Sequence, residues 1–157
     1  MHGAPPYTTG EPGSTARAGG ARQQVLIEAE AGSLLEFLPD PFILFPQSRF
    51  ASGLRIRAHE SATVIVADSF LCHDPAGAGA MFDRFEGVLR VEDPQGRLLA
   101  LDRFRTTGAI LAEHRPGLTG AFAAQGSLFA IGRQGASAAV VDALRKAVAD
   151  RADVYAE

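Results

Sequence analysis

The chain has 157 residues, 46% of them hydrophobic, which suits one domain with a core of its own and is too short for two. Its 15 basic and 18 acidic residues give a net charge of -3, which disfavours a nucleic-acid partner because phosphate binding needs an excess of Lys and Arg. The single cysteine excludes an internal disulfide, and no apolar run is of membrane length, so we expect a soluble cytoplasmic protein without a membrane partner.

Residues 1–22 consist mainly of Gly, Pro, Ala, Thr and Ser. Such a composition buries too little apolar surface to offset the entropy lost on ordering. We therefore expect a flexible N-terminal arm, followed by a single β domain over residues 23–157.

Short runs of β-forming residues follow the arm, separated by turn residues, and no long helical period precedes the C-terminus. The first runs are residues 24–30 and 34–38. Pro39 and Pro41 flank Asp40, and because the residue before a proline is driven out of the helical region, Asp40 should be extended with its carboxylate directed outward. The pattern predicts an all-β body.

Two further runs differ in their patterning, which indicates two stacked layers of strands. Leu54 to Ala58 alternates apolar residues with Arg55 and Arg57, as in a strand with one wet face. Thr63 to Ala67 is apolar and β-branched without alternation, which is typical of a strand covered on both faces.

A hairpin is predicted around Asp93-Pro94-Gln95-Gly96, with strands at residues 87–92 and 97–104, because Pro and Gly occupy the second and fourth turn positions. Asp102 and Arg103 are neighbours in the second strand, so they should face opposite ways and find separate, structural partners.

Near the C-terminus the period changes to that of an amphipathic helix, predicted over residues 137–153 with Ser137 as its N-cap. Such a helix either packs on the protein's own sheet, which we favour, or docks on a partner.

The segment Glu36-Phe37-Leu38-Pro39, followed by Ile43-Leu44-Phe45, resembles a segment that marks the UreD/UreH family of urease accessory proteins. Three further pieces resemble the family in the same order. They are residues 67–75, the hairpin strands 89–91 and 99–104, and residues 126–130. The family's first sheet region, with its Gly-Gly-Asp-Arg signature, has no counterpart here, so the chain resembles an N-terminally shortened member.

The resemblance implies a layered β-helical or sandwich-like body with a small helical part. It also implies a non-enzymatic scaffold for urease maturation, which helps to deliver nickel to apo-urease in complex with UreF and UreG. Nickel would then pass through transiently, with no tightly bound cofactor. No catalytic motif opposes this, since the sequence has no nucleophile elbow, phosphate loop or metalloprotease helix.

Two groups of residues are candidate metal ligands. Cys72, His73 and Asp74 offer a thiolate, an imidazole and a carboxylate, although neighbours in a strand face opposite ways and could meet one ion only if the segment turns. A structural reading, with a buried Cys and an Asp that caps a turn, is the alternative.

Glu36, Asp40 and Asp68 form the second group, because a nickel ion that is handed on needs weak oxygen ligands. In the family, acids on these segments are thought to line an internal path to urease. Solvation or pairing with Arg is the alternative role for such acids.

Apolar residues around the two prolines are candidates for partner binding, although burial in the core would also explain them: Phe37, Leu38, Phe42, Ile43 and Phe45. Two other functions stay open. One is a β domain that binds a small ligand in a deep apolar pocket. The other is a nonfunctional remnant of the family, whose exposed strand edges would aggregate or need a partner's strands.

Overall fold

A computed structural model gives the fold and describes residues 19–116, 119–120, 122–132 and 136–150. The expected flexible arm, residues 1–22, lies almost wholly outside the described residues. The elements in chain order are β1 (Ala21–Ala29), β2 (Leu34–Phe37), β3 (Phe42–Leu44), β4 (Arg49–Ala58), β5 (Thr63–Cys72), β6 (Arg84–Glu92), β7 (Leu98–Thr106), α1 (Gly108–Ala112), β8 (Ala124–Ile131) and α2 (Ala136–Val148).

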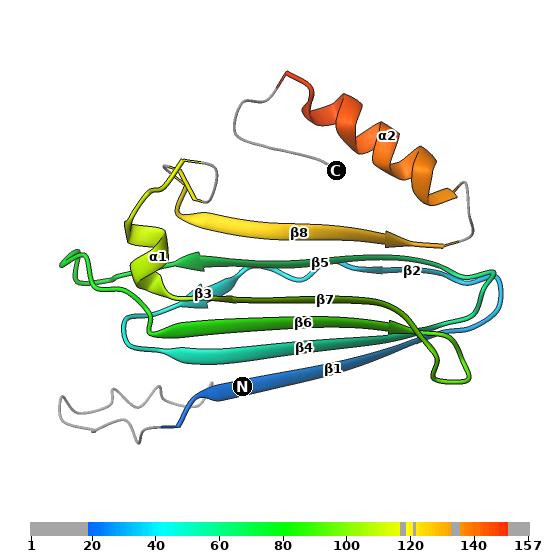
Figure 1. The fold of residues 1–157 in the computed structure, drawn as a ribbon, viewed down its shortest axis with the longest axis horizontal. Coiled ribbons are helices and arrows are strands. Elements are labelled where there is room, and N and C mark those ends of the chain that lie inside the picture. The colour runs from blue at the N-terminus through cyan, green and yellow to red at the C-terminus, as the bar shows by residue number, and fades with distance from the viewer. Residues whose placement is uncertain (1–18, 117–118, 121, 133–135, 151–157) are drawn as a thin grey trace, which may run out of the picture.

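The strands form two sheets. The first sheet has the order β1-β4-β6-β7, in which β1, β4 and β6 are parallel and β7 returns antiparallel to β6 (Figure 1). In the second sheet β5 is central, with β2 and β3 parallel to it along one edge and β8 antiparallel along the other. The chain thus alternates between the sheets, as in a coil whose turns stack on one another.

The two prolines divide one edge strand into β2 and β3. Phe37 lies opposite Val66, and Phe42 lies opposite Phe70, so the edge strand uses one residue more than β5 over this distance. A proline cannot donate to the ladder and is confined to edges and bulges. Asp40, between the prolines, is exposed, in agreement with the outward carboxylate expected from the sequence.

Alternate residues of both sheets face inward and bury an apolar core. Leu54, Ile56 and Ala58 are buried, while Arg55 and Arg57 lie on the outer side of the first sheet, as the sequence predicts. Opposite them, Val64 and Val66 of β5 are buried. The expectation of an all-β body in two layers is confirmed.

The core has two parts. One is aliphatic and includes Ile27, Ile56, Val64 and Val91, and the other is largely aromatic and lies nearer the C-terminal end of β5. In the aromatic part, the ring of Phe85 contacts those of four other phenylalanines, with centroids 4.7 to 5.9 Å away: Phe42, Phe50, Phe70 and Phe104.

The predicted hairpin is confirmed between β6 and β7. The N–H of Gly96 donates to the carbonyl of Asp93 at 2.9 Å, and Gly96 has φ +85°, which favours glycine. The carboxylate of Asp93 accepts the N–H groups of Gln95 and Arg97 at 3.0 and 2.8 Å. A bulge at Val91 and Glu92 shifts the register by one residue beside the turn.

The structure differs from the sequence-based expectation at β5. Ile65 and Ala67 are half-buried, so the outer face of β5 is only partly covered. A central strand with neighbours on both sides favours β-branched residues whether or not both faces are covered, and this accounts for the apolar run.

Helix α2 lies beside β8 (Figure 1), and its apolar positions, Val140, Val141, Leu144 and Val148, are half-buried. Ser137, the expected N-cap, is the second residue of the helix. Residues 151–153, the end of the expected helix, lie outside the described residues. Neither described helix is long and apolar enough to cross a membrane.

Replacing Phe85 by alanine should lower the free energy of unfolding by about 3–5 kcal/mol, because a fully buried ring is lost from an aromatic cluster. Urea unfolding followed by circular dichroism measures this loss. The matched control, Phe122→Ala, removes an exposed ring and should change stability by less than about 0.5 kcal/mol. Equal losses in the two variants would contradict the assigned core.

Candidate functional site

Asp68 is the one charged residue that β5 directs between the two sheets. It shares its face of the strand with Val64, Val66 and Phe70, all of which are buried. Its half-buried carboxyl lies where the aliphatic part of the core ends and the aromatic part begins. A charge at this place interrupts the core and calls for polar neighbours.

Polar neighbours are present on the side of β7 and β8. A cavity of about 180 Å³ opens there between the two sheets. The rings of Phe70 and Phe104, stacked with centroids 6.1 Å apart, form part of its wall. Its polar lining consists of Asp68, Asp102, Gln125 and Ser127, of which the last three are exposed, so the cavity is open to water.

Polar groups also lie on the opposite side of Asp68. Gln23 of β1 and the buried Ser52 of β4 join Asp68 in lining a small void of about 10 Å³, roughly the room of one water molecule. We call the six residues with polar side chains that line these two cavities the polar layer: Gln23, Ser52, Asp68, Asp102, Gln125 and Ser127. The polar layer crosses the interior from the β1 side to the β7 and β8 side, and Asp68 belongs to both cavities.

Burial raises the pKa of Asp68, and the negative charge of Asp102 raises it further, while the backbone N–H of Ser69 acts in the opposite direction. Two carboxylates with an amide and a hydroxyl nearby are oxygen donors of the kind that divalent cations accept. In the described ranges no three His, Cys, Asp or Glu side chains converge as a metal site would require.

Glu36 and Asp40, the other acids expected on an internal path, lie apart from Asp68. Glu36 is exposed on β2 and pairs in register with Ile65, whose side chain points away from the interior. Asp40 is exposed between the prolines. The structure thus brings Asp68 together with Asp102 rather than with Glu36 or Asp40.

The side chains of Cys72, His73 and Asp74 have three different sets of neighbours. The Sγ of Cys72 lies 3.6 Å from the Sδ of Met81, and the ring of His73 packs edge-on against Phe45. Asp74 accepts the N–H groups of Ala76 and Ala80 at 3.1 and 2.9 Å. These bonds, that of Ala80 foremost, hold the pKa of Asp74 below its usual range and fix the loop after β5.

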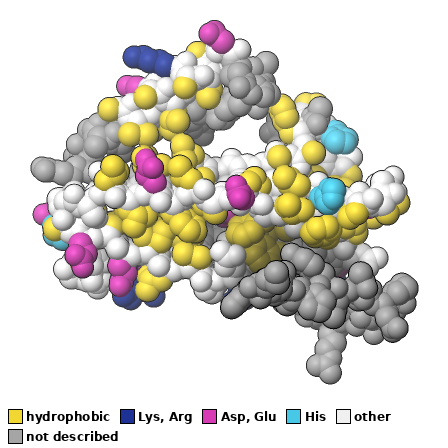
Figure 2. All heavy atoms as spheres, turned by 180° about the vertical axis from the view of Figure 1, so that it is seen from behind, with side chains coloured by type: hydrophobic (Ala, Val, Ile, Leu, Met, Phe, Trp, Pro, Cys, Tyr) yellow, Lys and Arg dark blue, Asp and Glu magenta, His cyan; other side chains and the backbone are white. Residues whose placement is uncertain are grey.

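The candidate partner-binding residues divide between core and surface. Phe37 packs on the aliphatic part of the core and Phe42 on the aromatic part. Leu38, Ile43 and Phe45 are exposed, together with Leu34. Hydrophobic side chains run across the middle of the face seen from behind (Figure 2). The β2 and β3 edge therefore offers an apolar surface.

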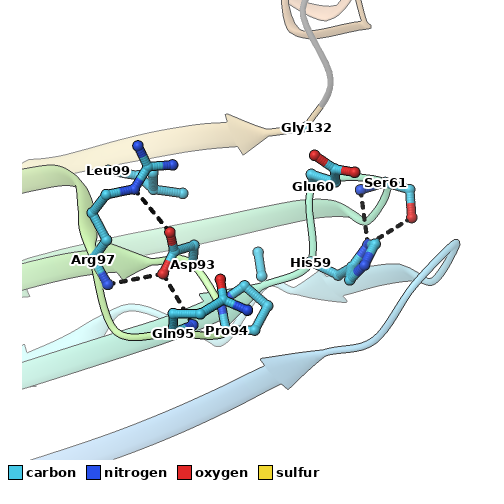
Figure 3. A pocket seen from close by; sticks show the side chains of 10 residues that line it. His59, Glu60, Ser61, Asp93, Pro94, Gln95, Arg97, Leu99 and Gly132 are labelled. Atoms are coloured by element: carbon cyan, nitrogen blue, oxygen red, sulfur yellow. Dashed lines mark hydrogen bonds and ion pairs between the residues drawn. The ribbon is translucent and has the colours of Figure 1, made fainter.

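A larger cleft of about 940 Å³ lies at the end of the sheets near the β4–β5 and β6–β7 turns (Figure 3). Its polar side chains bond mainly to one another. His59 contacts the hydroxyl of Ser61 at 2.8 Å, and Arg97 donates to Asp93 at 2.9 Å. Its lining is mostly polar, and the deep apolar pocket that small-ligand binding needs is not found in the described part of the chain.

The sequence predicts that Asp102 and Arg103 face opposite ways, which the structure bears out, but it does not mark the place of Asp102 beside Asp68. Leu89 faces inward and pairs with Asp102 across the hairpin, so alternation directs Asp102 inward and Arg103 outward. The bulge beside the turn hides this register when strands are counted from the turn.

Comparison with known proteins gives one consistent result. The sequence model of the family described as UreD urease accessory protein matches residues 8–156. The chain is similar to urease accessory protein UreD 1 of Pseudomonas syringae pv. syringae (strain B728a), with 38% identity over 135 residues, or 86% of this chain and 47% of the relative. Identity to UreD 1 of Pseudomonas syringae pv. tomato (strain ATCC BAA-871 / DC3000) is 36%, over 87% of this chain and 47% of the relative. The chain spans about half the length of these curated relatives.

The substitution Asp68→Asn should stabilise the protein at pH 7. Because the pKa of Asp68 is raised in the folded state, folding loses stability as pH rises from the unfolded pKa of about 3.9 through the higher folded value. The amide removes this cost, which solvent screening limits to about 1 kcal/mol. The gain should shrink towards about pH 3, where the carboxyl is protonated in both states.

Urea unfolding at the two pH values measures the difference. The control Asp40→Asn changes an exposed carboxylate and should have little effect at either pH. A loss of stability at pH 7 in Asp68→Asn would show that the ionised carboxylate is well accommodated and would contradict the assigned environment.

Proposed function

Because this chain belongs to the UreD family of urease accessory proteins, we propose that it is a non-catalytic scaffold of urease maturation. It binds apo-urease together with UreF and UreG and helps to deliver nickel to the urease active site. A cytoplasmic location suits this role. The chain spans about half the length of its curated relatives, so the proposal concerns what this β body contributes to such a complex.

The observation that carries the nickel part of the proposal is the position of Asp68 in the interior. Its carboxyl lines a cavity on each side, so a cation that entered between β7 and β8 would meet Asp102 first and Asp68 next. The residues that line the cavity include only two carboxylates and neither an imidazole nor a thiolate. Such a lining makes a weak nickel site. A weak site suits a cargo ion, because the ion must leave as readily as it enters.

The scaffold part of the proposal is supported by surface that the described residues leave open. Leu34, Leu38, Ile43 and Phe45 expose large apolar side chains along the β2 and β3 edge. The pairings of the described strands leave β1 and β7 as the edges of the first sheet, and β2, β3 and β8 as those of the second, and exposed edges of this kind attract further strands. A partner that covers the β2 and β3 edge would bury apolar surface and satisfy backbone groups at once.

Co-expression with apo-urease, UreF and UreG from the same source tests the proposal. The tagged chain should co-elute with at least one of them on size exclusion, with a full-length UreD relative and its own partners as the positive control. If the relative binds and this chain stays free or aggregates, the chain is a nonfunctional fragment and the proposal is wrong.

The substitution Ile43→Asp should weaken that association at least about tenfold, because it places a charge in the apolar surface that the partner is proposed to cover. The control Leu128→Asp makes the same kind of change on β8, at a leucine of similar exposure, and should leave co-elution unchanged. Equal effects of the two substitutions would show that the β2 and β3 edge is not part of the interface.

A further inference from the structure

The outer face of the first sheet carries much of the chain's positive charge. Alternation and register place eight arginines on it: Arg22, Arg49, Arg55, Arg57, Arg84, Arg90, Arg103 and Arg105. Three acids of the paired strands share this face: Glu28, Glu86 and Glu92. A fourth, Asp83 just before β6, pairs with Arg49 at 2.9 Å. The formal excess of four positive charges contrasts with a net charge of -3 for the whole chain. The face seen from behind shows few basic side chains, so charge is segregated on the molecule (Figure 2).

Glu92 organises the middle of this basic face. Although it lies on the outer side, its side chain is only 1% exposed, because three arginine side chains surround it. The Nε and Nη2 atoms of Arg55 donate to its Oε2 at 2.8 and 2.6 Å, Arg90 donates to its Oε1, and the Nε of Arg57 lies 3.8 Å away. One carboxylate thus fixes the guanidinium groups of Arg55 and Arg90 and neutralises only one of them, while Arg57 donates to Glu28 at 3.1 Å.

Arg55 and Arg90 are neighbours in a row that runs across the four strands of the first sheet, and a leucine stands at each end of this row. Leu26 pairs with Arg55, Arg55 with Arg90 and Arg90 with Leu101, which gives the row Leu-Arg-Arg-Leu across β1, β4, β6 and β7. Leu26 and Leu101 are 53% and 45% exposed, which is costly for a surface that stays in water. Beside this row lies a groove of about 310 Å³ whose charged lining is three arginines and one acid: Arg22, Arg55, Arg90 and Glu86.

We propose that the outer face of the first sheet binds a partner protein through an acidic segment that also carries aliphatic side chains. The carboxylates of the partner pair with Arg22, Arg55 and Arg90 around the groove, and its aliphatic side chains cover Leu26 and Leu101. The proposal rests on the scaffold function above for the source of the partner, but it adds a second surface, distinct from the β2 and β3 edge.

A protein fits this face better than a nucleic acid does. A phosphate backbone carries closely and evenly spaced charges that would meet Glu28 and Glu86 as well as the arginines, whereas a protein segment can place its few carboxylates opposite the arginines alone. The exposed leucines also gain nothing from phosphates. Complementary charge in a protein interface chiefly sets specificity and the association rate, and it makes binding sensitive to salt.

The double variant Arg22→Glu with Arg103→Glu tests the proposal. Neither arginine forms an ion pair with another residue in the described ranges, so the fold should be unaffected, which circular dichroism checks. Binding is measured by biolayer interferometry against purified apo-urease, UreF and UreG. The variant should bind at least about tenfold more weakly to one of these proteins, and wild-type binding to it should weaken as salt rises from about 0.05 to about 0.5 M.

The control, Arg145→Glu with Lys146→Glu, makes the same change in net charge on exposed residues of α2 and should bind within about twofold of wild type. Because it also breaks the exposed ion pair of Arg145 with Asp142, circular dichroism checks its helix content as well. If the first variant folds poorly, the neutral pair Arg22→Gln with Arg103→Gln replaces it, with a smaller expected loss.

Equal weakening by both charge reversals would indicate a non-specific effect of net charge and would overturn the proposal. Unchanged binding of Arg22→Glu with Arg103→Glu would overturn it while the scaffold function stands. If the wild-type chain binds none of the three proteins, the scaffold function and this proposal both fail. Tighter binding of wild type to a single-stranded RNA of about 30 nucleotides than to any of the proteins would assign the face to nucleic acid instead.

Discussion

The structure depends on the in-register stacking of successive turns of chain, each of which contributes a strand to both sheets. Residue by residue, β1 lies on β4 and β4 on β6, so every second side chain faces the same interior. A slip of one residue would move Ile27, Ile56 and Val91 to the surface and arginines into the core. This constraint explains why the inner face is apolar and why basic residues collect on the outer face of the first sheet.

Asp68 is an exception to this rule that inward-facing side chains are apolar, and it has polar neighbours on both sides. It occupies an inward position of the central strand, divides the core into an aliphatic and an aromatic part, and is matched by Ser52 and Gln23 on one side and by Asp102 on the other. A buried apolar side chain at this position would serve stability better. The polar layer is therefore the part of the interior that stability does not explain, and it is where we place the passage of nickel.

Much of the fold follows from the sequence because two-residue periodicity and turn chemistry are local signals. The faces of Leu54 to Ala58 and the Asp93–Gly96 turn were predicted correctly. The meeting of Asp68 with Asp102 was not, because it depends on how two sheets are stacked and on a bulge at Val91 and Glu92 that the sequence does not mark. For the same reason the three side chains of Cys72-His73-Asp74, adjacent in the chain, have separate surroundings. The shielding of Glu92 by three arginines likewise needs the register of β4 against β6.

The most direct measurement of the central claim is nickel-dependent urease activity in cells that produce apo-urease, UreF and UreG together with this chain. The chain should raise activity, and the double variant Asp68→Ala with Asp102→Ala should lose most of that gain, at least about tenfold, while it still co-elutes with its partners. The control variant Glu60→Ala with Asp150→Ala removes two exposed acids that lie outside both the polar layer and the β2 and β3 edge, and it should behave as wild type. Full activity in the Asp68 and Asp102 variant, or no gain from the wild-type chain, would contradict the account.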